Sequence, residues 1–554
     1  MEHTNIKLPP YAKFSPETGL RWKKLFIGNF VPIVSTVIEL QSDTQGKQDV
    51  ELFVLFTDGS CSEPRTISVS KLKDVDWFAL DNRCQIDPDC PKAGVYLASI
   101  VQLAMQDYEP LRKTSIDQPG VHELDGRAVF CKGDRLYPES AENDTEIHFV
   151  PPPISLDIDT NLSEQTATKA MLSAVRLHYN VGIMLILQVL LSIMRSVFTS
   201  IGIPPSCVLF LVGDSGLGKT QFASLLVQIY NRAKGLAPTT QLTSSFPALK
   251  DILSDPLNTD QTVLVDDMFP SDITEIRRKF EAVFTKLVRL IGNQNSPAMM
   301  SGKTVTEKPP KCGVIIIGEY PSGLRSDAAR CLIVELTSSV LGERLHWFQQ
   351  RQLFVPTFYS FYINWFIDNY DSIKNLLAKW LENFRKSNLG VNAHLQDTYF
   401  CFASAHKLFL QYCVAKGFTS INNAWIEQRN FEDLLMHLVQ KQNERVYQDI
   451  QTQAKKPDVF ELIKDLYRNG FEIAKSKKKY DANPSSYDAL IHNEMLCVPS
   501  ETLMTALRSK GYTYTANEIR TSLLDNEALK LDSESKNYKI GSKRFYGIYL
   551  SKLK

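Results

Sequence analysis

Short, continuous apolar runs punctuate the middle of the chain, and stretches with helical spacing of apolar residues separate them. Strands that are buried on both faces of a parallel sheet have this uninterrupted apolar character, whereas half-exposed strands alternate. The segment from 205 to 340 is therefore predicted to be a doubly wound α/β domain. Its expected strands are Val208–Val212, Val263–Val265, Val314–Ile317 and Leu332–Val334.

Three further regions are predicted around this domain. Runs with strand character at 50–56 and 66–70, separated by Asp58-Gly59, indicate a strand-rich N-terminal domain that ends before Pro151-Pro152-Pro153. A helical, aromatic-rich region and a small terminal domain follow the α/β domain. The expected boundaries are 1–150 for the N-terminal domain, 160–340 for the α/β domain, 341–480 for the helical region and 485–554 for the terminal domain.

The longest apolar stretch, 183–203, is interrupted by Gln188 and Arg195. Its uninterrupted length falls short of the roughly 20 residues that cross a bilayer, so a buried helix is expected and no membrane contact. No secretory signal is visible at Met1, so a cytoplasmic protein with reduced cysteines is expected. Lys and Arg together number 62, as do Asp and Glu, so any basic surface must be local.

A phosphate-binding motif follows the first predicted strand. Glycines allow backbone N–H groups to surround phosphates, and the N-terminus of the following helix faces the negative charge. The lysine would reach the β- and γ-phosphates of ATP, and the threonine hydroxyl would bind Mg²⁺. Strand and helix are both in place, which disfavours a chance glycine loop. The motif reads Gly213-Asp214-Ser215-Gly216-Leu217-Gly218-Lys219-Thr220.

Two acidic residues end the second predicted strand, as in a Walker B motif. Asp266 is expected to hold Mg²⁺ through water, and Asp267 is expected to polarise the attacking water. Many ATPases of this kind carry glutamate at the second position, so the shorter Asp267 is a departure. The alternative is an acidic helix cap after a strand.

These motifs, in this order, resemble the AAA+ ATPases. More narrowly, they are similar to the MCM-like and superfamily-3-like replicative helicases of bacterial mobile elements. The narrower resemblance rests on the segment from Ser326 to Val334, on Gly318-Glu319 after the third strand, and on the order of the domains. It implies an AAA+ core in a ring, expected to be a homohexamer, that moves along DNA.

The resemblance also implies two catalytic roles. Glu319 matches the position of a polar residue that aligns water against the γ-phosphate; a salt-bridged glutamate at a strand end is the alternative. Arg330, with Arg325 as second choice, matches an arginine that stabilises the γ-phosphate in the neighbouring subunit. The alternative for Arg330 is local pairing with Asp327.

A helix that begins near Asp272 and a hairpin at 298–306 lie between the Walker B acids and the third strand. The helix's basic residues Arg278, Lys286 and Arg289 are expected on a solvated face. Related ring helicases insert such a hairpin into the central channel, which implies that Lys303, with Lys308 in support, contacts DNA phosphates. An ordinary exposed hairpin lysine is the alternative.

The terminal domain has a winged helix-turn-helix pattern. Helices are predicted over 499–510 and 516–528, and strands around 538–540 and 545–550. From 536 to 554 there are six Lys and Arg residues and no acidic residue, so Lys543 and Arg544 are expected to contact DNA phosphates. Winged helices also bind proteins, which remains the alternative.

Taken together, the chain is predicted to be an ATP- and Mg²⁺-dependent DNA helicase of α/β class, acting on single-stranded DNA. Origin duplex is a further expected partner if the chain also initiates replication of a mobile element. A protein-remodelling AAA+ ATPase, whose terminal domains bind partners, is the alternative. A metabolic P-loop kinase fits less well because no second substrate motif is present.

Overall fold

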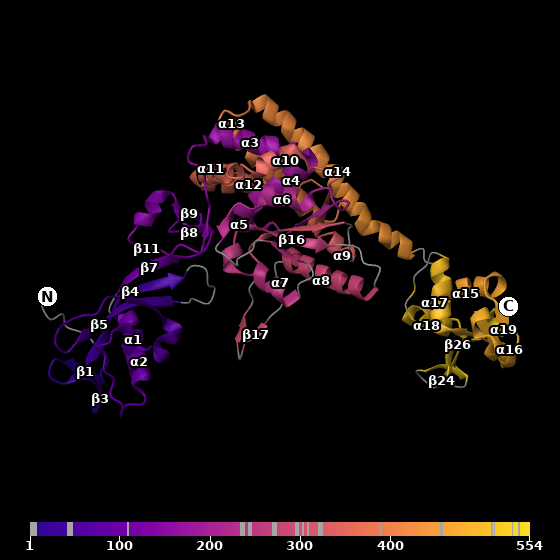
Figure 1. Cartoon of the computed structure of the whole chain (residues 1–554), viewed down its shortest axis with the longest axis horizontal. Coiled ribbons are helices and arrows are strands. Elements are labelled where there is room, and N and C mark those ends of the chain that lie inside the picture. Colours follow the sequence, from indigo (N-terminus) through magenta and orange to yellow (C-terminus); the bar gives the residue numbers. More distant parts are fainter. Residues whose placement is uncertain are drawn as a thin grey trace. The chain divides into compact units, whose positions relative to one another are not determined.

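The computed structural model describes two compact units, Met1–Val446 and Tyr447–Lys554. The first unit contains the N-terminal domain, the α/β domain and most of the helical region (Figure 1). The described residues are 8–40, 48–107, 110–232, 239–241, 246–268, 274–293, 299–301, 304–306, 310–319, 325–387, 389–454, 458–510, 514, 516–533, 536–540 and 543–553.

A five-stranded parallel sheet forms the centre of the α/β domain, with strand order β15-β16-β19-β13-β20. The four predicted strands are confirmed. The edge strand β15 was not predicted, because its residues are polar and lack an apolar run. The strands are β13 (Val208–Val212), β15 (Thr239–Gln241), β16 (Thr262–Met268), β19 (Gly313–Gly318) and β20 (Cys331–Glu335).

Alternate residues of these strands enter two different cores. Leu209 and Ile315 face the core that contains α4 and α6, whereas Phe210 and Ile316 face the core that contains α7 and α8. Because both faces are covered, the four predicted strands contain continuous apolar runs, as the pattern predicts. The covering helices are α3 (Glu164–Val175), α4 (Tyr179–Ile193), α5 (Arg195–Ser200), α6 (Lys219–Val227), α7 (Phe246–Leu253) and α8 (Thr274–Asn293).

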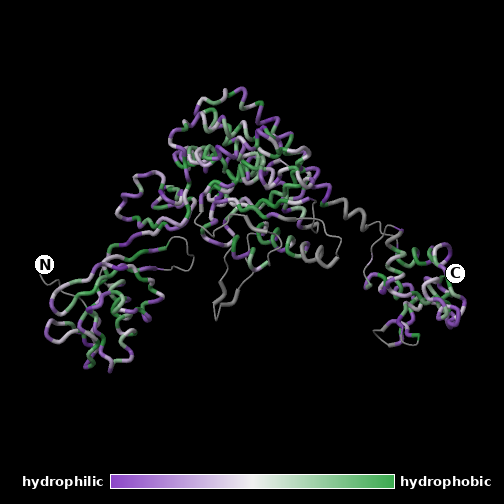
Figure 2. Tube along the Cα trace, in the orientation of Figure 1, coloured by the Kyte–Doolittle hydropathy of each residue, from purple (hydrophilic) through white to green (hydrophobic). Residues whose placement is uncertain are grey.

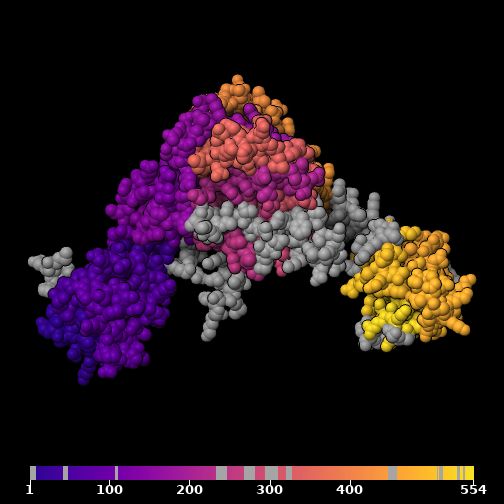
Figure 3. Space-filling model, in the orientation of Figure 1, coloured from indigo at the N-terminus to yellow at the C-terminus, as the bar shows by residue number. Residues whose placement is uncertain are grey.

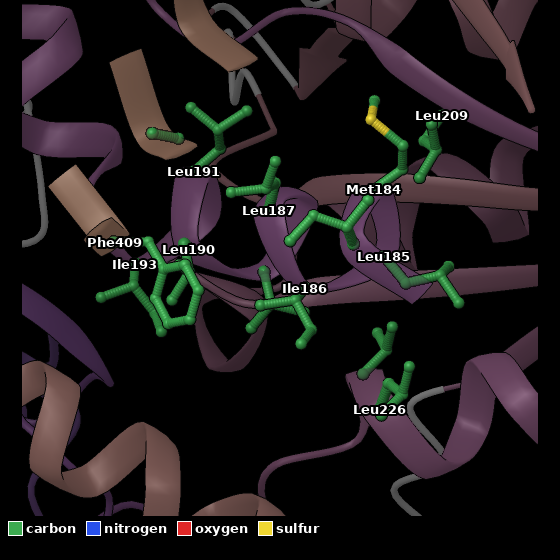
Figure 4. Close-up of a cluster of buried hydrophobic side chains, with 14 of the residues drawn as sticks. Met184, Leu185, Ile186, Leu187, Leu190, Leu191, Ile193, Leu209, Leu226 and Phe409 are labelled. Carbon is green, nitrogen blue, oxygen red and sulfur yellow. The ribbon is translucent and has the colours of Figure 1, made fainter. Parts of the chain in front are cut away.

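Helix α4 is the predicted buried helix. Its residues from Val181 to Ile193 are all buried, and Figure 4 shows Met184, Leu187 and Leu190 among apolar neighbours. The apolar segments of Figure 2 gather in this part of the α/β domain. Among the described residues, no helix combines the length and the apolar character that a membrane crossing requires.

A helical layer continues the first unit after β20. Its core is rich in aromatic residues, and Phe358 and Tyr362 each contact Tyr412 edge to face within the same core as α4. The short helix α9 (Arg325–Ala328) precedes β20, and the helices of this layer are α10 (Glu343–Gln349), α11 (Phe354–Asp368), α12 (Tyr370–Arg385), α13 (Ala393–Ala415) and α14 (Ile421–Ala454).

Three sheets confirm the strand-rich character of the N-terminal domain. The largest has the order β11-β7-β4-β5-β6, and β1–β3 and β8–β10 form two smaller antiparallel sheets. The strands are β1 (Ala12–Ser15), β2 (Gly19–Trp22), β3 (Leu25–Gly28), β4 (Phe30–Leu40), β5 (Gln48–Phe56), β6 (Arg65–Ser68), β7 (Leu111–Ile116), β8 (Gly120–Leu124), β9 (Arg127–Cys131), β10 (Leu136–Tyr137) and β11 (Ile147–Phe149).

Helices and a short strand pair complete this domain. Helix α2 (Ala93–Asp107) packs on β4, and the short helices are α1 (Trp77–Leu80), η1 (Val69–Asp74) and η2 (Glu139–Asn143). After the proline-rich break, β12 (Ile154–Ser155) pairs with β14 (Asn231–Arg232) of the α/β domain. Sheet β8–β10 is tied to α11, because Lys132 Nζ donates to Ser360 Oγ at 3.0 Å.

The second unit packs several helices against a six-stranded sheet. Helix α15, within the expected helical region of 341–480, packs in this core. Its elements are α15 (Val459–Asn469), β21 (Ile473–Ala474), α16 (Lys477–Ala482), η4 (Pro484–Ser486), β22 (Ala489–His492), β23 (Met495–Pro499), α17 (Ser500–Ser509), α18 (Ala516–Asp525), β24 (Leu529–Ser533), β25 (Lys536–Ile540), β26 (Lys543–Tyr549) and α19 (Leu550–Leu553).

The second predicted helix of the terminal domain is shorter than expected. Helix α18 ends at Asp525 because Glu527 adopts a left-handed backbone with φ of 51°, and strand β24 then begins at Leu529. The pattern did not predict β24. The helix predicted over 499–510 and the two predicted strands are present as α17, β25 and β26.

Candidate nucleotide site

The glycine-rich loop connects the end of β13 to the start of α6. Gly216 and Gly218 adopt left-handed backbones, with φ of 79° and 88°, which favour glycine. At Gly213 a Cβ atom would lie 2.6 Å from the carbonyl oxygen of Leu336, so no side chain fits there. The three glycines of the predicted motif are therefore required by the backbone path and by the close approach of the segment after β20.

Lys219 is the first residue of α6 and is 9% exposed. Its ammonium group donates to the carbonyl oxygens of Gly213 and Asp214, both at 2.7 Å. These two bonds hold the cation against the loop. The ammonium is thereby placed where the oxygens of a bound phosphate would accept its hydrogen bonds.

A cavity of about 300 Å³ opens beside this loop. Both Asp266, at the end of β16, and Glu319, just after β19, line the cavity together with Lys219 and Thr220. The parallel sheet explains this convergence, since the carboxyl ends of neighbouring strands meet at one edge. The structure thus brings together predicted site residues that are separated by about 100 positions in the sequence.

Leu341 also lines this cavity, and sequence reasoning missed it. Its side chain is 46% exposed, and a Cβ on Gly218 would lie 2.6 Å from its Cδ2. The neighbouring Val340 N–H donates to the Leu217 carbonyl at 3.1 Å, which holds the segment against the loop. No sequence motif includes this leucine. The available indication in the sequence was an apolar residue a few positions after the last strand.

The Walker B acids lie at an irregularity of the sheet. Val265 pairs with Ile316 and Met268 pairs with Gly318, so the register shifts across Asp266 and the next residue. Such a bulge redirects side chains at the end of a strand. Asp266 is half-buried and lines the cavity, whereas the side chain of Asp267 lies outside the described residues.

These residues fit Mg²⁺ and a nucleoside triphosphate. Gly216 has open space where a side chain would lie, so a phosphate could approach the backbone there, and Lys219 supplies a positive charge. The hydroxyl of Thr220 and the carboxylate of Asp266 are oxygen ligands of the kind that Mg²⁺ prefers. When bound, the ion would neutralise charge on the phosphate oxygens, and Glu319, which lines the same cavity, would be available to orient water.

Arg330 directly precedes β20, at the opposite end of the strands from the cavity. Its carbonyl accepts the N–H of Val208 at the start of β13, and its Nε donates to Asn293 Oδ1 at 3.0 Å. A Cβ on Gly292 would lie 2.4 Å from Arg330 Cδ, so the arginine packs closely on the end of α8. Five strand residues, or about 17 Å, separate it from the phosphate edge of its own chain. The side chain of Arg325 lies outside the described residues.

Lys286 and Arg289 are exposed, as expected of a solvated basic face on α8, and Arg289 also pairs with an acid from α9. Its Nε donates to Asp327 Oδ1 at 3.0 Å, and Thr285 Oγ1 donates to the other carboxylate oxygen at 2.7 Å. The carboxylate of Asp327 is fully buried, so it requires such partners. The periodicity of α8 predicts that Arg289 lies opposite the apolar stripe. It does not predict that α9 supplies Asp327 as the partner of this arginine.

The predicted DNA contacts are only partly within the described residues. Strands β17 (Met299–Ser301) and β18 (Thr304–Thr306) confirm the hairpin, with Ser301 opposite Thr304. Lys303 and Lys308 lie outside the described residues. In the second unit, Lys543 and Arg544 are exposed at the start of β26, and Lys543 Nζ lies 5.8 Å from the ring centroid of Tyr480.

Comparison with known proteins finds similarity in structure but not in sequence. No model of a known protein family matches the chain, and no curated protein matches it at a significant level. A solved structure described as the active helicase Cch of SCCmec type IV is similar over 99% of this chain and 100% of that one, with a TM-score of 0.50 and 14% identity. The chain has a helicase-like fold.

Two other solved helicase-related structures are similar at lower scores. The apo C-terminal region of NrS-1 shares 10% identity over 93% of this chain and 95% of its own, with a TM-score of 0.29. The JCV helicase shares 12% identity over 42% of this chain and 72% of its own, with a TM-score of 0.21. These scores are too low to establish a shared fold, so the helicase-like assignment of the fold depends on the first structure.

Proposed function

We propose that the chain is an ATP-dependent DNA helicase of the AAA+ type, similar to the MCM-like and superfamily-3-like enzymes of mobile elements. The observation that carries this proposal is the cavity that joins Lys219, Thr220, Asp266 and Glu319 at one edge of the parallel sheet. Such an arrangement suits phosphate binding and the activation of water on a γ-phosphate. The whole-length likeness in fold to a protein described as an active helicase directs this chemistry toward DNA.

The order of the strands supports the AAA+ assignment. Strand β19 lies between β13, which carries the phosphate loop, and β16, which carries the Walker B acids. The additional-strand ATPases, to which the AAA+ proteins belong, have a strand inserted at this place. Glu319 follows β19, so its position relative to the phosphates is the one that the family resemblance implies for the water-aligning residue.

The position of Arg330 supports the proposal of a ring assembly. This arginine precedes β20, at the opposite end of the strands from the phosphate loop of its own chain, which supports a role in the site of a neighbouring subunit. We propose a homo-oligomeric ring, expected to be a hexamer, in which Arg330 completes the partner's site. The hairpin of β17 and β18 would then face the channel, with Lys303 on DNA phosphates.

The decisive experiment measures ATP hydrolysis by the purified chain with and without single-stranded DNA, together with unwinding of a labelled fork. We expect DNA to stimulate hydrolysis and the chain to separate the strands in an ATP-dependent manner. Lys219→Ala should abolish both, because it removes the cation beside the phosphates. Robust hydrolysis that no DNA stimulates would instead favour the protein-remodelling ATPase.

Two sets of variants test the DNA contacts. Lys303→Ala should lower DNA-stimulated hydrolysis for all sequences alike and spare basal hydrolysis, since a phosphate contact carries no sequence information. Lys379→Ala, at an exposed lysine of α12, is the control and should change neither. Lys543→Ala with Arg544→Ala should flatten the salt dependence of DNA binding by about one to two counterions. Unchanged values in every assay would exclude these contacts.

A further inference from the structure

The small sheet β1–β3 carries an exposed, positively charged face in the N-terminal domain. Its other face is covered, because Ala12, Leu20 and Ile27 are buried in the core of the domain. Residues alternate between the two faces along a strand, so Lys13, Arg21 and Phe26 lie on the uncovered face. All three are exposed, and their strands belong to the indigo surface of Figure 3.

The register places these three side chains in one row. Lys13 is directly opposite Arg21 on the neighbouring strand, and Arg21 is directly opposite Phe26 on the third strand. Like charges in such a pair repel each other and destabilise the sheet. Neither cation has an acidic partner among the residues that the structure describes. An anion bound over the row would relieve this repulsion.

The aromatic residue completes the surface. Phe26 packs over Gly19, where a Cβ would lie 2.7 Å from its Cε2, and it remains 37% exposed. At the rim, Tyr11 is 57% exposed and Lys23 Nζ lies 5.1 Å from its ring centroid. Between positions 8 and 28 there are four Lys or Arg residues and one acidic residue, Glu17, so the local net charge is +3 in a chain that is neutral overall.

We propose that this face binds single-stranded DNA, with Lys13 and Arg21 on phosphates and a base stacked on Phe26. Unpaired cations beside exposed aromatic rings on a sheet are the combination that single-stranded nucleic acid uses, because each nucleotide offers one charge and one flat apolar face. In a duplex the bases are stacked on one another and do not reach a ring on a sheet. This binding site is separate from the nucleotide cavity and does not depend on hydrolysis.

The test measures the affinity of the full chain for a labelled oligothymidylate by fluorescence anisotropy at several salt concentrations, without nucleotide. Lys13→Ala with Arg21→Ala should weaken binding and reduce the slope of log K against log salt by about 1.4, as two phosphate contacts contribute. Phe26→Leu keeps an apolar side chain over Gly19. It should weaken binding about fivefold or more without changing the slope.

Controls come from the same domain. Arg65→Ala removes an exposed cation from β6, and Phe78→Leu changes a phenylalanine that is 64% exposed on α1. Neither should alter the affinity for the oligonucleotide. Basal ATP hydrolysis and the thermal unfolding temperature should match the wild type in all variants, which shows that a loss of affinity is not a loss of folding.

Two results would overturn the proposal. Unchanged affinity in the double variant would show that this face does not bind DNA. If the double variant changed subunit assembly instead, the face would be assigned to protein contact. A loss from the two cations with no effect of Phe26→Leu, or an equal effect of Phe26→Leu on duplex, would exclude the stacked base. The helicase proposal fails separately, by DNA-independent hydrolysis, so the two failures are distinguishable.

Discussion

Arg330 offers the sharpest test of the proposed assembly. If it completes the site of a neighbouring subunit, Arg330→Ala should abolish hydrolysis while each chain keeps an intact phosphate loop. Arginines that stabilise the transition state in this way contribute about a thousandfold or more to turnover. The distance of about 17 Å from its own phosphate edge means that no rearrangement of the side chain alone could supply the same effect within one chain.

Mixing two inactive variants gives a quantitative expectation. In an equal mixture of Arg330→Ala and Lys219→Ala chains, an interface is competent when an intact loop meets an intact arginine. Each of these conditions holds for about half of the subunits, so about one quarter of the interfaces in a randomly mixed ring should be active. Hydrolysis should therefore recover to about a quarter of the wild-type rate, from two components that are each inactive.

The assay is a titration of one variant into the other at constant total protein, with steady-state phosphate release as the readout. Exchange of subunits must be verified by energy transfer between differently labelled chains. Wild-type protein mixed with Lys219→Ala provides the control for dilution. A mixture as inactive as its components, despite verified exchange, would show that Arg330 acts within its own chain or has no role in catalysis.

Three further predictions concern single residues. Gly218→Ala should weaken ATP binding at least about tenfold in a fluorescent-nucleotide titration. A residue with a side chain pays ~1–2 kcal/mol for a left-handed backbone, and its Cβ would also clash with the loop after β20. Gly202→Ala, with φ of 83° and open space around it, is the control. Asp267→Asn should bind ATP without hydrolysing it, and wild-type phosphate release would transfer the role of the base to Glu319. Burial lowers the pKa of His406 to about 4, from 6.5, so stability is complete above pH 6.5 and is lost as the pH falls toward 4. Urea unfolding should show a loss of about 2 kcal/mol between pH 7 and pH 5 in the wild type and a smaller one in His406→Phe, and equal losses would contradict this.

Much of the α/β domain is predictable because its signals are local. Four of the five strands contain continuous apolar runs and are confirmed. Their ends lie within one residue of the prediction, except that β16 continues three residues beyond Val265 to Met268. Strand β15 was missed because an edge strand with polar residues has no such run. Strand β24 was missed because α18 ends at the left-handed backbone of Glu527, and a glutamate in the sequence does not predict that conformation.

The sequence by itself predicts phosphate-binding chemistry for the loop between β13 and α6. Gly213, Gly218 and Lys219 are identifiable without coordinates, since backbone geometry and charge leave few alternatives at those spacings. Asp266 and Glu319 were also expected at this site, but only the tertiary structure decided that they share one cavity and that Leu341 lines it. Asp266, Glu319 and Leu341 come together because the parallel order of the sheet is set by the burial of both strand faces, a property of the packed domain and not of any one segment.

The same holds for charges. The pairing of Arg289 with Asp327 and the absence of an acidic partner for Lys13 and Arg21 among the described residues follow from which surfaces are covered. Periodicity assigns a basic residue to the polar side of an element, but it does not reveal whether an acid from elsewhere faces it. That difference is decided by tertiary packing, because burying the carboxylate of Asp327 is tolerated only where a cation and a hydroxyl reach it.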